Sequence, residues 1–229
     1  MKVGYKDLGT MSYKECWELQ QSLFDNRLAM RRAGEQGEDC GTILTVEHTP
    51  VYTLGKSGKQ SNMLISEAYL QSLGAEFFHI DRGGDITFHG PGQIVCYPIL
   101  DIGALGIGLR RYIEILEQAV IDTVAVYGIT AERLEGATGV WICDRDSAGV
   151  ERNWRKICAI GVRASHFITM HGLALNVATD LKWFTMINPC GFTDKGVTSI
   201  EKEVAQSVDV EQVKSLLVTN LTKLLLAEA

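Results

Sequence analysis

Hydrophobic positions recur every three or four residues in three long segments of the chain, which predicts three amphipathic helices. The first runs from Tyr13 to the glycine at position 34, and Ser12 with Glu15 forms the Ser-x-x-Glu pattern of a helix N-terminus. The other two are expected over 108–127 and 209–227. A shorter helix is expected between Ser66, as its N-cap, and Gly74.

Short apolar runs rich in β-branched residues separate these helices and predict strands. The expected strands cover 3–8, 42–47, 51–55, 76–81, 94–100, 130–134, 138–143, 156–162, 167–170 and 172–177. Consecutive strands outnumber strand–helix–strand alternations, and a charged hairpin loop is expected over 144–154. The pattern therefore favours an α+β fold with mixed, largely antiparallel sheets flanked by helices, in one domain over 1–229.

Composition narrows the class of protein. Hydrophobic residues make up 46% and charged residues 22% of the chain, as in ordinary globular proteins, and the net charge of −6 argues against a broad nucleic-acid footprint. The N-terminal residues carry no apolar signal, and no later run approaches the length of a membrane span. A cytoplasmic protein that binds neither nucleic acid nor membrane is expected.

Metal sites and cofactor motifs are not indicated. The six cysteines lie at wide spacing without a Cys-x-x-Cys pair and are interpreted as free thiols: Cys16, Cys40, Cys96, Cys143, Cys158 and Cys190. The histidines include no His-Glu-x-x-His motif, and phosphate-loop and dinucleotide fingerprints are absent. We predict no metal and no cofactor.

The segment 82–93, Arg-Gly-Gly-Asp-Ile-Thr-Phe-His-Gly-Pro-Gly-Gln, is unusually rich in glycine. Paired glycines beside a strand indicate close approach of the backbone, and a ligand is one candidate for what approaches it. A pair of tight turns around a four-residue strand explains the same residues. Of the five histidines, His89 in this segment is the one most suited to a functional role.

Cys190 and Lys156 are the residues with the most reactive side chains in unusual settings. Cys190 lies in the turn-like sequence Pro-Cys-Gly, where a thiol can be exposed, although a free cysteine is more often inert. Lys156 opens an apolar run; it either faces solvent at a strand end or is buried, and burial would lower its pKa toward neutrality. A cysteine nucleophile with a lysine base is suited to acyl transfer.

Four segments together resemble the lipoyl(octanoyl) transferases. They are 47–55 (Glu-His-Thr-Pro-Val-Tyr-Thr-Leu-Gly), the glycine-rich segment 82–93, 156–161 (Lys-Ile-Cys-Ala-Ile-Gly), and 171–176 (His-Gly-Leu-Ala-Leu-Asn) followed by 188–191 (Asn-Pro-Cys-Gly). Each motif alone is modest, but four in this order over almost the whole chain are specific.

The resemblance implies the α+β fold of biotin and lipoate protein ligase catalytic domains and an acyltransferase activity. It assigns Cys190 as the nucleophile and Lys156 as its partner. The substrate-binding residues that it implies are Arg82, Gly83, Gly84, Asp85, Ile86, Thr87, Phe88, His89, Ala159, Ile160, Gly161, Gly172, Leu173 and Ala174.

The reaction implied by the resemblance moves an octanoyl group from acyl carrier protein to a lysine of lipoyl domains. The acceptors would be 2-oxoacid dehydrogenase complexes and the glycine cleavage H protein, and the enzyme would act as a monomer. Because these partners are acidic, local cations would guide docking, and the candidates are Arg31, Arg32, Lys56, Lys59, Arg110, Arg111, Arg152 and Arg155. Backbone N–H groups near Gly191 or in the Gly83–Gly84 turn would hold the oxyanion.

Two other functions fit parts of the pattern. An ATP-dependent lipoate or biotin ligase would share the fold but would need no cysteine. A catalytically silent acyl-binding protein would keep the acyl pocket, but the presence of both Cys190 and Lys156 argues against it.

Overall fold

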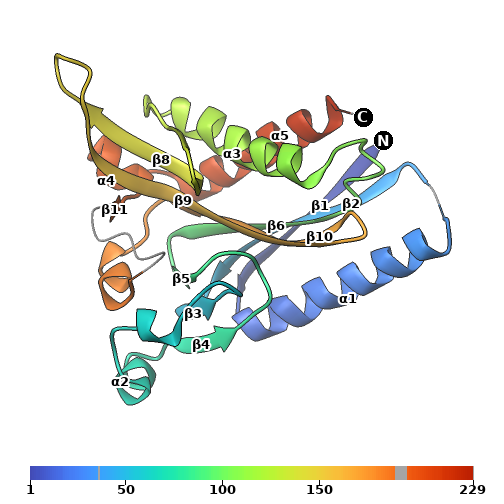
Figure 1. Cartoon of the computed structure of the whole chain (residues 1–229), viewed down its shortest axis with the longest axis horizontal. Coiled ribbons are helices and arrows are strands. Elements are labelled where there is room, and N and C mark those ends of the chain that lie inside the picture. Colours follow the sequence, from blue (N-terminus) through green and yellow to red (C-terminus); the bar gives the residue numbers. More distant parts are fainter. Residues whose placement is uncertain (36, 189–194, 229) are drawn as a thin grey trace.

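The structure, a computed structural model, describes residues 1–35, 37–188 and 195–228 (Figure 1). Its helices are α1 (Tyr13–Arg32), α2 (Glu67–Ser72), α3 (Leu109–Ala125), α4 (Ile200–Val204) and α5 (Val210–Leu226). Short 3-10 turns cover Gln60–Asn62 and Leu181–Met186. The Ser12 hydroxyl accepts a hydrogen bond from the N–H of Glu15, which confirms the predicted start of the first helix.

The larger sheet has the strand order β1-β2-β6-β10-β9-β8-β7, with β11 also paired to β9. Its strands are β1 (Lys2–Met11), β2 (Asp39–His48), β6 (Gln93–Leu100), β7 (Glu132–Leu134), β8 (Ala137–Arg145), β9 (Glu151–Ser165), β10 (Ile168–Asn176) and β11 (Gly196–Val197). The smaller sheet has the order β4-β3-β5. Its strands are β3 (Val51–Leu54), β4 (Glu76–His79) and β5 (Ile86–His89).

Both sheets are mixed. The pairs β1–β2, β9–β11 and β3–β4 are parallel, and the remaining strand pairs are antiparallel. Helices and strands do not alternate regularly along the chain. The α+β prediction with largely antiparallel sheets is therefore confirmed.

Helices cover both faces of the larger sheet (Figure 1). On one face, α3 and α5 bury a core that includes Leu116, Val120 and Leu217 together with apolar residues of β8, β9 and β10. On the opposite face, α1 packs Cys16 and Phe24 against β2, β6 and β10. The smaller sheet has its own core with α2 and the 181–186 turn. Among the helices that the structure describes, none has the length and apolar character needed to cross a membrane.

Several predicted boundaries were wrong for identifiable reasons. The segments 167–170 and 172–177 form one continuous strand, β10, because His171 between them stays in the ladder opposite Val162. The loop expected over 144–154 is shorter, since pairs such as Arg145–Glu151 form across the hairpin and extend both strands. The sequence did not predict α4, β11 or the 181–186 turn, which are too short for a recognisable period.

Candidate active site

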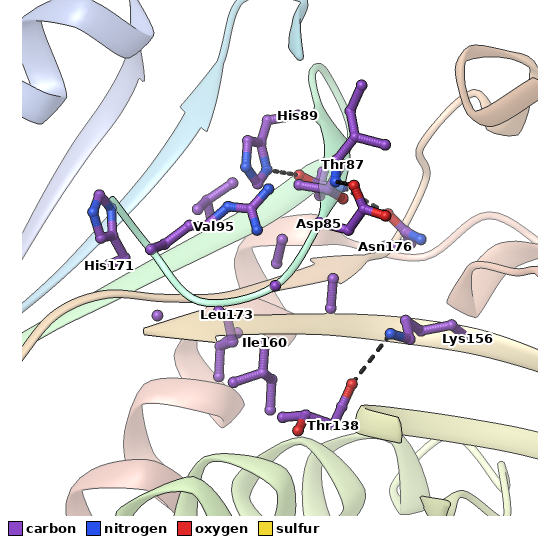
Figure 2. Close-up of a pocket in the computed structure, with 18 of the residues that line it drawn as sticks. Asp85, Thr87, His89, Val95, Thr138, Lys156, Ile160, His171, Leu173 and Asn176 are labelled. Atoms are coloured by element: carbon purple, nitrogen blue, oxygen red, sulfur yellow. Dashed lines mark hydrogen bonds between the residues drawn. The ribbon is translucent and has the colours of Figure 1, made fainter. Parts of the chain in front are cut away.

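A cavity of about 390 Å³ lies between β9 and β10 of the larger sheet and the glycine-rich segment 82–93 (Figure 2). Apolar side chains of β6, β9 and β10 form much of its wall, among them Val95, Ile160 and Leu173. Polar groups, including Lys156 and His89, also face it. An apolar pocket of this size with a few convergent polar groups is the usual form of a small-molecule site.

Most of the residues predicted to bind substrate line this cavity, and so does Lys156. Those that line it are Arg82, Gly84, Asp85, Ile86, Thr87, His89, Ala159, Ile160, Gly161, Gly172, Leu173 and Ala174. Gly83 and Phe88 are not among the lining residues. Phe88 is fully buried and stacks on Trp183, with 4.9 Å between ring centroids. Cys190 lies outside the described residues.

The interpretation of the glycine-rich segment as turns around a short strand is confirmed, and its interpretation as a ligand-binding segment stays a prediction. Turns bracket the four-residue strand β5, as the simpler interpretation expected, and the same segment forms one wall of the cavity. The Gly83 N–H donates to the Val162 carbonyl at 2.9 Å, which ties the segment to the end of the β9 wall. The Gly83 N–H is therefore already paired within the chain, and an oxyanion role for the Gly83–Gly84 turn stays a prediction.

Two glycines of the predicted acyl site allow chain segments to approach each other. Gly161 and Gly172 lie opposite one another in the β9–β10 ladder. A Cβ atom at Gly172 would overlap the carbonyl oxygen of Cys96 on β6, and one at Gly161 would lie 2.7 Å from the Gly83 carbonyl oxygen. Their lack of a side chain is therefore required by the packing of the wall itself.

Arg82 is buried, and its guanidinium holds the wall together. It donates to the Thr53 carbonyl at 2.7 Å, to the Thr53 hydroxyl at 3.1 Å and to the Gly83 carbonyl at 3.0 Å. These bonds connect the glycine-rich segment to β3. Multiple donors in a fixed planar arrangement make arginine suited to such bracing.

Asp85 connects the cavity wall to the chain that precedes residue 189. Its carboxylate accepts from the Ile86 N–H and from the Asn62 side-chain amide, each at 2.6 Å. The Asn62 carbonyl accepts from the Asn188 N–H at 2.8 Å. Asn188, two residues before Cys190 in the sequence, is thereby held next to a residue that lines the cavity.

His89 begins a chain of hydrogen bonds behind the cavity. Its Nδ1–H donates to Gln93 at 2.8 Å, the Gln93 amide donates to Asn176 at 2.9 Å, and the Asn176 amide donates to the Thr198 carbonyl at 3.0 Å. Burial lowers the pKa of His89 to about 3, so the imidazole is neutral at physiological pH. His89 is thus a fixed polar element of the wall.

Lys156 lies in the interior of β9, opposite Trp141 of β8. Figure 2 shows its Nζ directed to the Thr138 carbonyl, to which it donates at 3.1 Å. The same Nζ lies 4.5 Å from the centroid of the Trp141 ring. Because β9 begins at Glu151, the strand-end interpretation of Lys156 was wrong: the side chain is partly buried and faces the cavity.

Some residues that line the cavity were not predicted, including Tyr13, Tyr97 and His171. Tyr97 could have been found, because Gln93, Val95 and Tyr97 alternate along β6 and share one face. Tyr13 belongs to α1, so only the tertiary fold brings it to the site. His171 donates from Nε2 to Asp81 at 2.9 Å, and its buried Nδ1 has no hydrogen-bond partner within the described part of the chain.

The cysteines among the described residues are unsuited to nucleophilic chemistry. Cys16, Cys96 and Cys158 are fully buried in the cores, and burial raises the pKa of each thiol. Cys143 is only partly buried, but burial and the adjacent Glu132 carboxylate raise its pKa to about 11. Low thiolate content makes these groups inert. Among the described residues, no group of three His, Cys, Asp or Glu side chains is arranged to hold a metal ion.

Comparison with known proteins assigns the family. The model of the lipoyl protein ligase A/B catalytic domain matches residues 12–222. The chain belongs to this family. An octanoyltransferase of Bacteroides fragilis (strain YCH46) is 51% identical over 228 residues, covering 100% of both chains. This lipoyl protein ligase A/B family member is therefore an acyltransferase.

Solved structures support the same fold. A putative lipoate protein ligase from T. acidophilum with bound lipoic acid has a TM-score of 0.65 at 15% identity, covering 98% of this chain and 86% of its own. Biotin protein ligase from Aquifex aeolicus in complex with biotin and ATP has a TM-score of 0.53 at 13% identity, covering 97% and 70%. The predicted fold of biotin and lipoate ligase catalytic domains is confirmed.

Proposed function

We propose that this chain transfers an octanoyl group from acyl carrier protein to a lysine of lipoyl domains, through a thioester on Cys190. The observation that carries the proposal is the position of Lys156, whose Nζ faces an apolar-walled cavity from the interior of β9. The octanoyltransferases that are about half identical over the full length support the choice of acyl group.

In the first half-reaction, Lys156 accepts the proton of the Cys190 thiol. The thiolate attacks the thioester carbonyl of the carrier-bound octanoyl group, and the carbon–sulfur bond to the carrier breaks. The carrier's thiolate leaves with the proton that Lys156 returns. One thioester replaces another, so the step requires no ATP and no cofactor.

In the second half-reaction, a lysine of the lipoyl domain attacks the acyl-Cys190 thioester. Its amine loses a proton with the help of Lys156, and the Cys190 thiolate leaves and is reprotonated. The product is an amide, which is more stable than a thioester, and this difference drives the cycle. The acceptors proposed are the lipoyl domains of 2-oxoacid dehydrogenase complexes and the glycine cleavage H protein, with the enzyme acting as a monomer.

The apolar wall of the cavity suits the acyl chain. Side chains of Val95, Ile160 and Leu173 line it, and the glycine-rich segment closes the opposite side. Each methylene removed from water contributes about 0.8 kcal/mol. Several buried methylenes therefore give enough free energy to hold the octanoyl group while its carbonyl is at the reacting end.

The described residues on both sides of Cys190 support its assignment. Asn188, before it, is bonded to Asn62, whose side chain binds Asp85 of the cavity wall. Val197, after it, is paired with Lys156 in the β9–β11 register, and the Thr198 N–H donates to the Lys156 carbonyl at 3.0 Å. The described residues on the two sides of Cys190 thus line the cavity or are linked by hydrogen bonds to its wall.

The transfer is tested by incubating the protein with octanoyl-acyl carrier protein and a lipoyl domain, without ATP, and measuring the mass of the lipoyl domain. The proposal predicts one octanoyl increment on one lysine. An increment that forms only from free octanoate and ATP would instead establish a ligase. No increment under either condition would contradict an octanoyl-transferring function.

A further inference from the structure

One peptide unit of β8, between Thr138 and Gly139, is hydrogen-bonded by two ionisable side chains from opposite sides. Its carbonyl accepts from the Lys156 Nζ at 3.1 Å (Figure 2). Its N–H donates to the carboxylate of Glu117 on α3 at 3.1 Å. The carbonyl and N–H of one trans peptide point in opposite directions, so the two side chains lie at the two ends of a single amide dipole.

The strand pairing explains why this peptide needs side-chain partners. In the β7–β8 register, Arg133 lies opposite Val140 and Leu134 lies opposite Ala137, so Thr138 and Gly139 form a bulge in β8. A bulge leaves backbone groups outside the ladder, and a buried N–H without a partner is destabilising. The Glu117 carboxylate satisfies the N–H that the ladder does not.

Glu117 is itself buried and fixed in place. Its side chain is 8% exposed, and its second oxygen accepts from Arg133 Nε at 3.0 Å. Arg133 also donates to the Glu114 carbonyl and to Gln118, which holds the guanidinium against α3. A carboxylate is rarely placed inside a protein without such a partner, because desolvation of the charge is costly.

Gly139 completes the arrangement. Its φ of +123° is in the region that favours glycine. A Cβ atom there would lie 2.6 Å from the Cys158 carbonyl oxygen and 3.4 to 3.5 Å from the Cε and Nζ of Lys156. The bulge therefore brings the peptide directly against the end of the lysine side chain.

We propose that Glu117 is a positioning residue for Lys156 and acts through the Thr138–Gly139 peptide. The carboxylate orients the peptide and polarises it, which makes the Thr138 carbonyl a stronger acceptor for the ammonium form of Lys156. Glu117 thereby sets both the place of the Nζ and the pH at which Lys156 loses its proton. The catalytic consequence rests on the proposed function, in which Lys156 exchanges protons with Cys190.

Other groups also face Lys156 and are kept constant in the test. They are the Trp141 ring and the Thr138 carbonyl of β8, the Cys158 thiol of β9, and, across the cavity, Arg82, Asp85, His89 and His171. None of these contacts Glu117 through a side-chain hydrogen bond in the described part of the chain. A change confined to Glu117 therefore reaches Lys156 through the bulged peptide and through space.

The test compares Glu117→Gln with Glu114→Gln, which removes the same charge one turn away on α3. The pH dependence of Lys156 labelling by a trace amine-reactive anhydride, read by peptide mass spectrometry, measures the pKa of Lys156 without reference to activity. We expect Glu117→Gln to lower that pKa by about 0.5 unit or more, since a nearby negative charge favours the ammonium form. Because the Nζ is no longer held in place, the maximal rate of octanoyl transfer should fall about tenfold, while the acidic limb of its pH–rate profile moves to lower pH.

The double variant Glu117→Gln/Arg133→Gln controls for loss of folding, because it removes the half-exposed Arg133 guanidinium together with its carboxylate partner. It should shift the labelling profile in the same direction as Glu117→Gln but by less, because the Arg133 cation is removed as well. An unchanged Lys156 labelling profile in a folded variant overturns the proposal, as does an equal shift in Glu114→Gln. If the wild-type protein transfers no octanoyl group, the proposed function fails, while the labelling profile still decides whether Glu117 acts on Lys156.

Discussion

Lys156 illustrates how one residue acquires a role from its surroundings. Its Nζ contacts the aromatic face of Trp141 and donates to the backbone carbonyl of Thr138. The sequence could show only a lysine in an apolar run, which is equally compatible with a solvated strand end. The deciding feature is the β8–β9 pairing, which places Trp141 opposite Lys156. The pattern of residues along the chain does not reveal that register.

His48 and His89 should make the stability of the fold depend on pH. Burial lowers their pKa values to about 4 and about 3, from an ordinary value of 6.5. A group whose pKa is lowered by folding contributes its full stability above the unfolded pKa and loses it as pH falls toward the folded value. Each histidine should therefore cost about 2 kcal/mol between pH 7 and pH 5.

Urea unfolding at several pH values measures this effect. The midpoint should fall as pH decreases from 7 to 5, and His89→Gln should make that fall smaller. The control is His166→Asn, which alters an exposed histidine in the β9–β10 turn and should leave the pH dependence as in the wild type. Equal pH dependence in wild type and His89→Gln would show that His89 does not titrate in this way.

At the scale of elements, the periodicity of hydrophobic residues predicted the long helices accurately and the ends of the strands less accurately. The helix that begins after Ser12 and the one predicted over 209–227 were located to within a few residues. The strand β9 is longer than its apolar run, because two charged residues before that run, Glu151 and Arg155, form ion pairs with the neighbouring hairpin strand and with α4. A prediction based only on the positions of apolar residues does not detect such ion pairs.

The contact between β6 and β10 depends on the absence of a side chain at Gly172. A Cβ atom there would overlap the Cys96 carbonyl oxygen, which belongs to the backbone and cannot rotate away. Gly172→Ala should therefore lower the free energy of unfolding by about 3 kcal/mol, the usual scale of overpacking. Gly37→Ala, at an open position, is the matched control and should change stability by less than about 0.5 kcal/mol.

Thermal or urea denaturation of both variants checks this prediction. Because Gly172 also lines the cavity, loss of octanoyl transfer alone would not report the packing effect. A Gly172→Ala protein as stable as the wild type would show that the two strands move apart at little cost.

At the scale of the whole molecule, the order of strands could not be read from the chain. Strands β2 and β6 are neighbours although 44 residues separate the end of one from the start of the other, and β6 also pairs with β10. The cavity walls come from segments this far apart in sequence. Residue patterns identified several of the wall segments, but only the resemblance to a known family brought them into one site.

Two exposed lysines beside the cavity are candidates for contact with the proposed acidic partners. Several of the cations predicted to guide docking already form ion pairs within the chain. Arg31 pairs with Asp101, Arg111 with Glu228 and Arg155 with Glu203. Lys56 and Lys59 are exposed and form no ion pair with any described residue. Their loop lies against the cavity wall, since the Lys56 N–H donates to the Arg82 carbonyl at 3.0 Å.

Reversal of these charges in Lys56→Glu/Lys59→Glu should lower kcat/KM for octanoyl-acyl carrier protein about tenfold at low salt. The difference should shrink as salt is added, because exposed charges are screened. Lys6→Glu/Lys223→Glu makes the same change in net charge elsewhere on the surface and serves as the control. Equal losses in the two double variants would assign the effect to net charge and not to this loop.

The central claim is that octanoyl transfer passes through a thioester on Cys190 with Lys156 as proton acceptor, and the intact mass of the protein tests it most directly. The protein is mixed with octanoyl-acyl carrier protein, without ATP or lipoyl domain, and quenched in acid. One octanoyl increment should appear on Cys190, persist in Cys143→Ala, be absent in Cys190→Ala and form at least a hundredfold more slowly in Lys156→Met, on the order expected for loss of a general base. An increment retained in Cys190→Ala, or formed at the wild-type rate in Lys156→Met, would contradict the account.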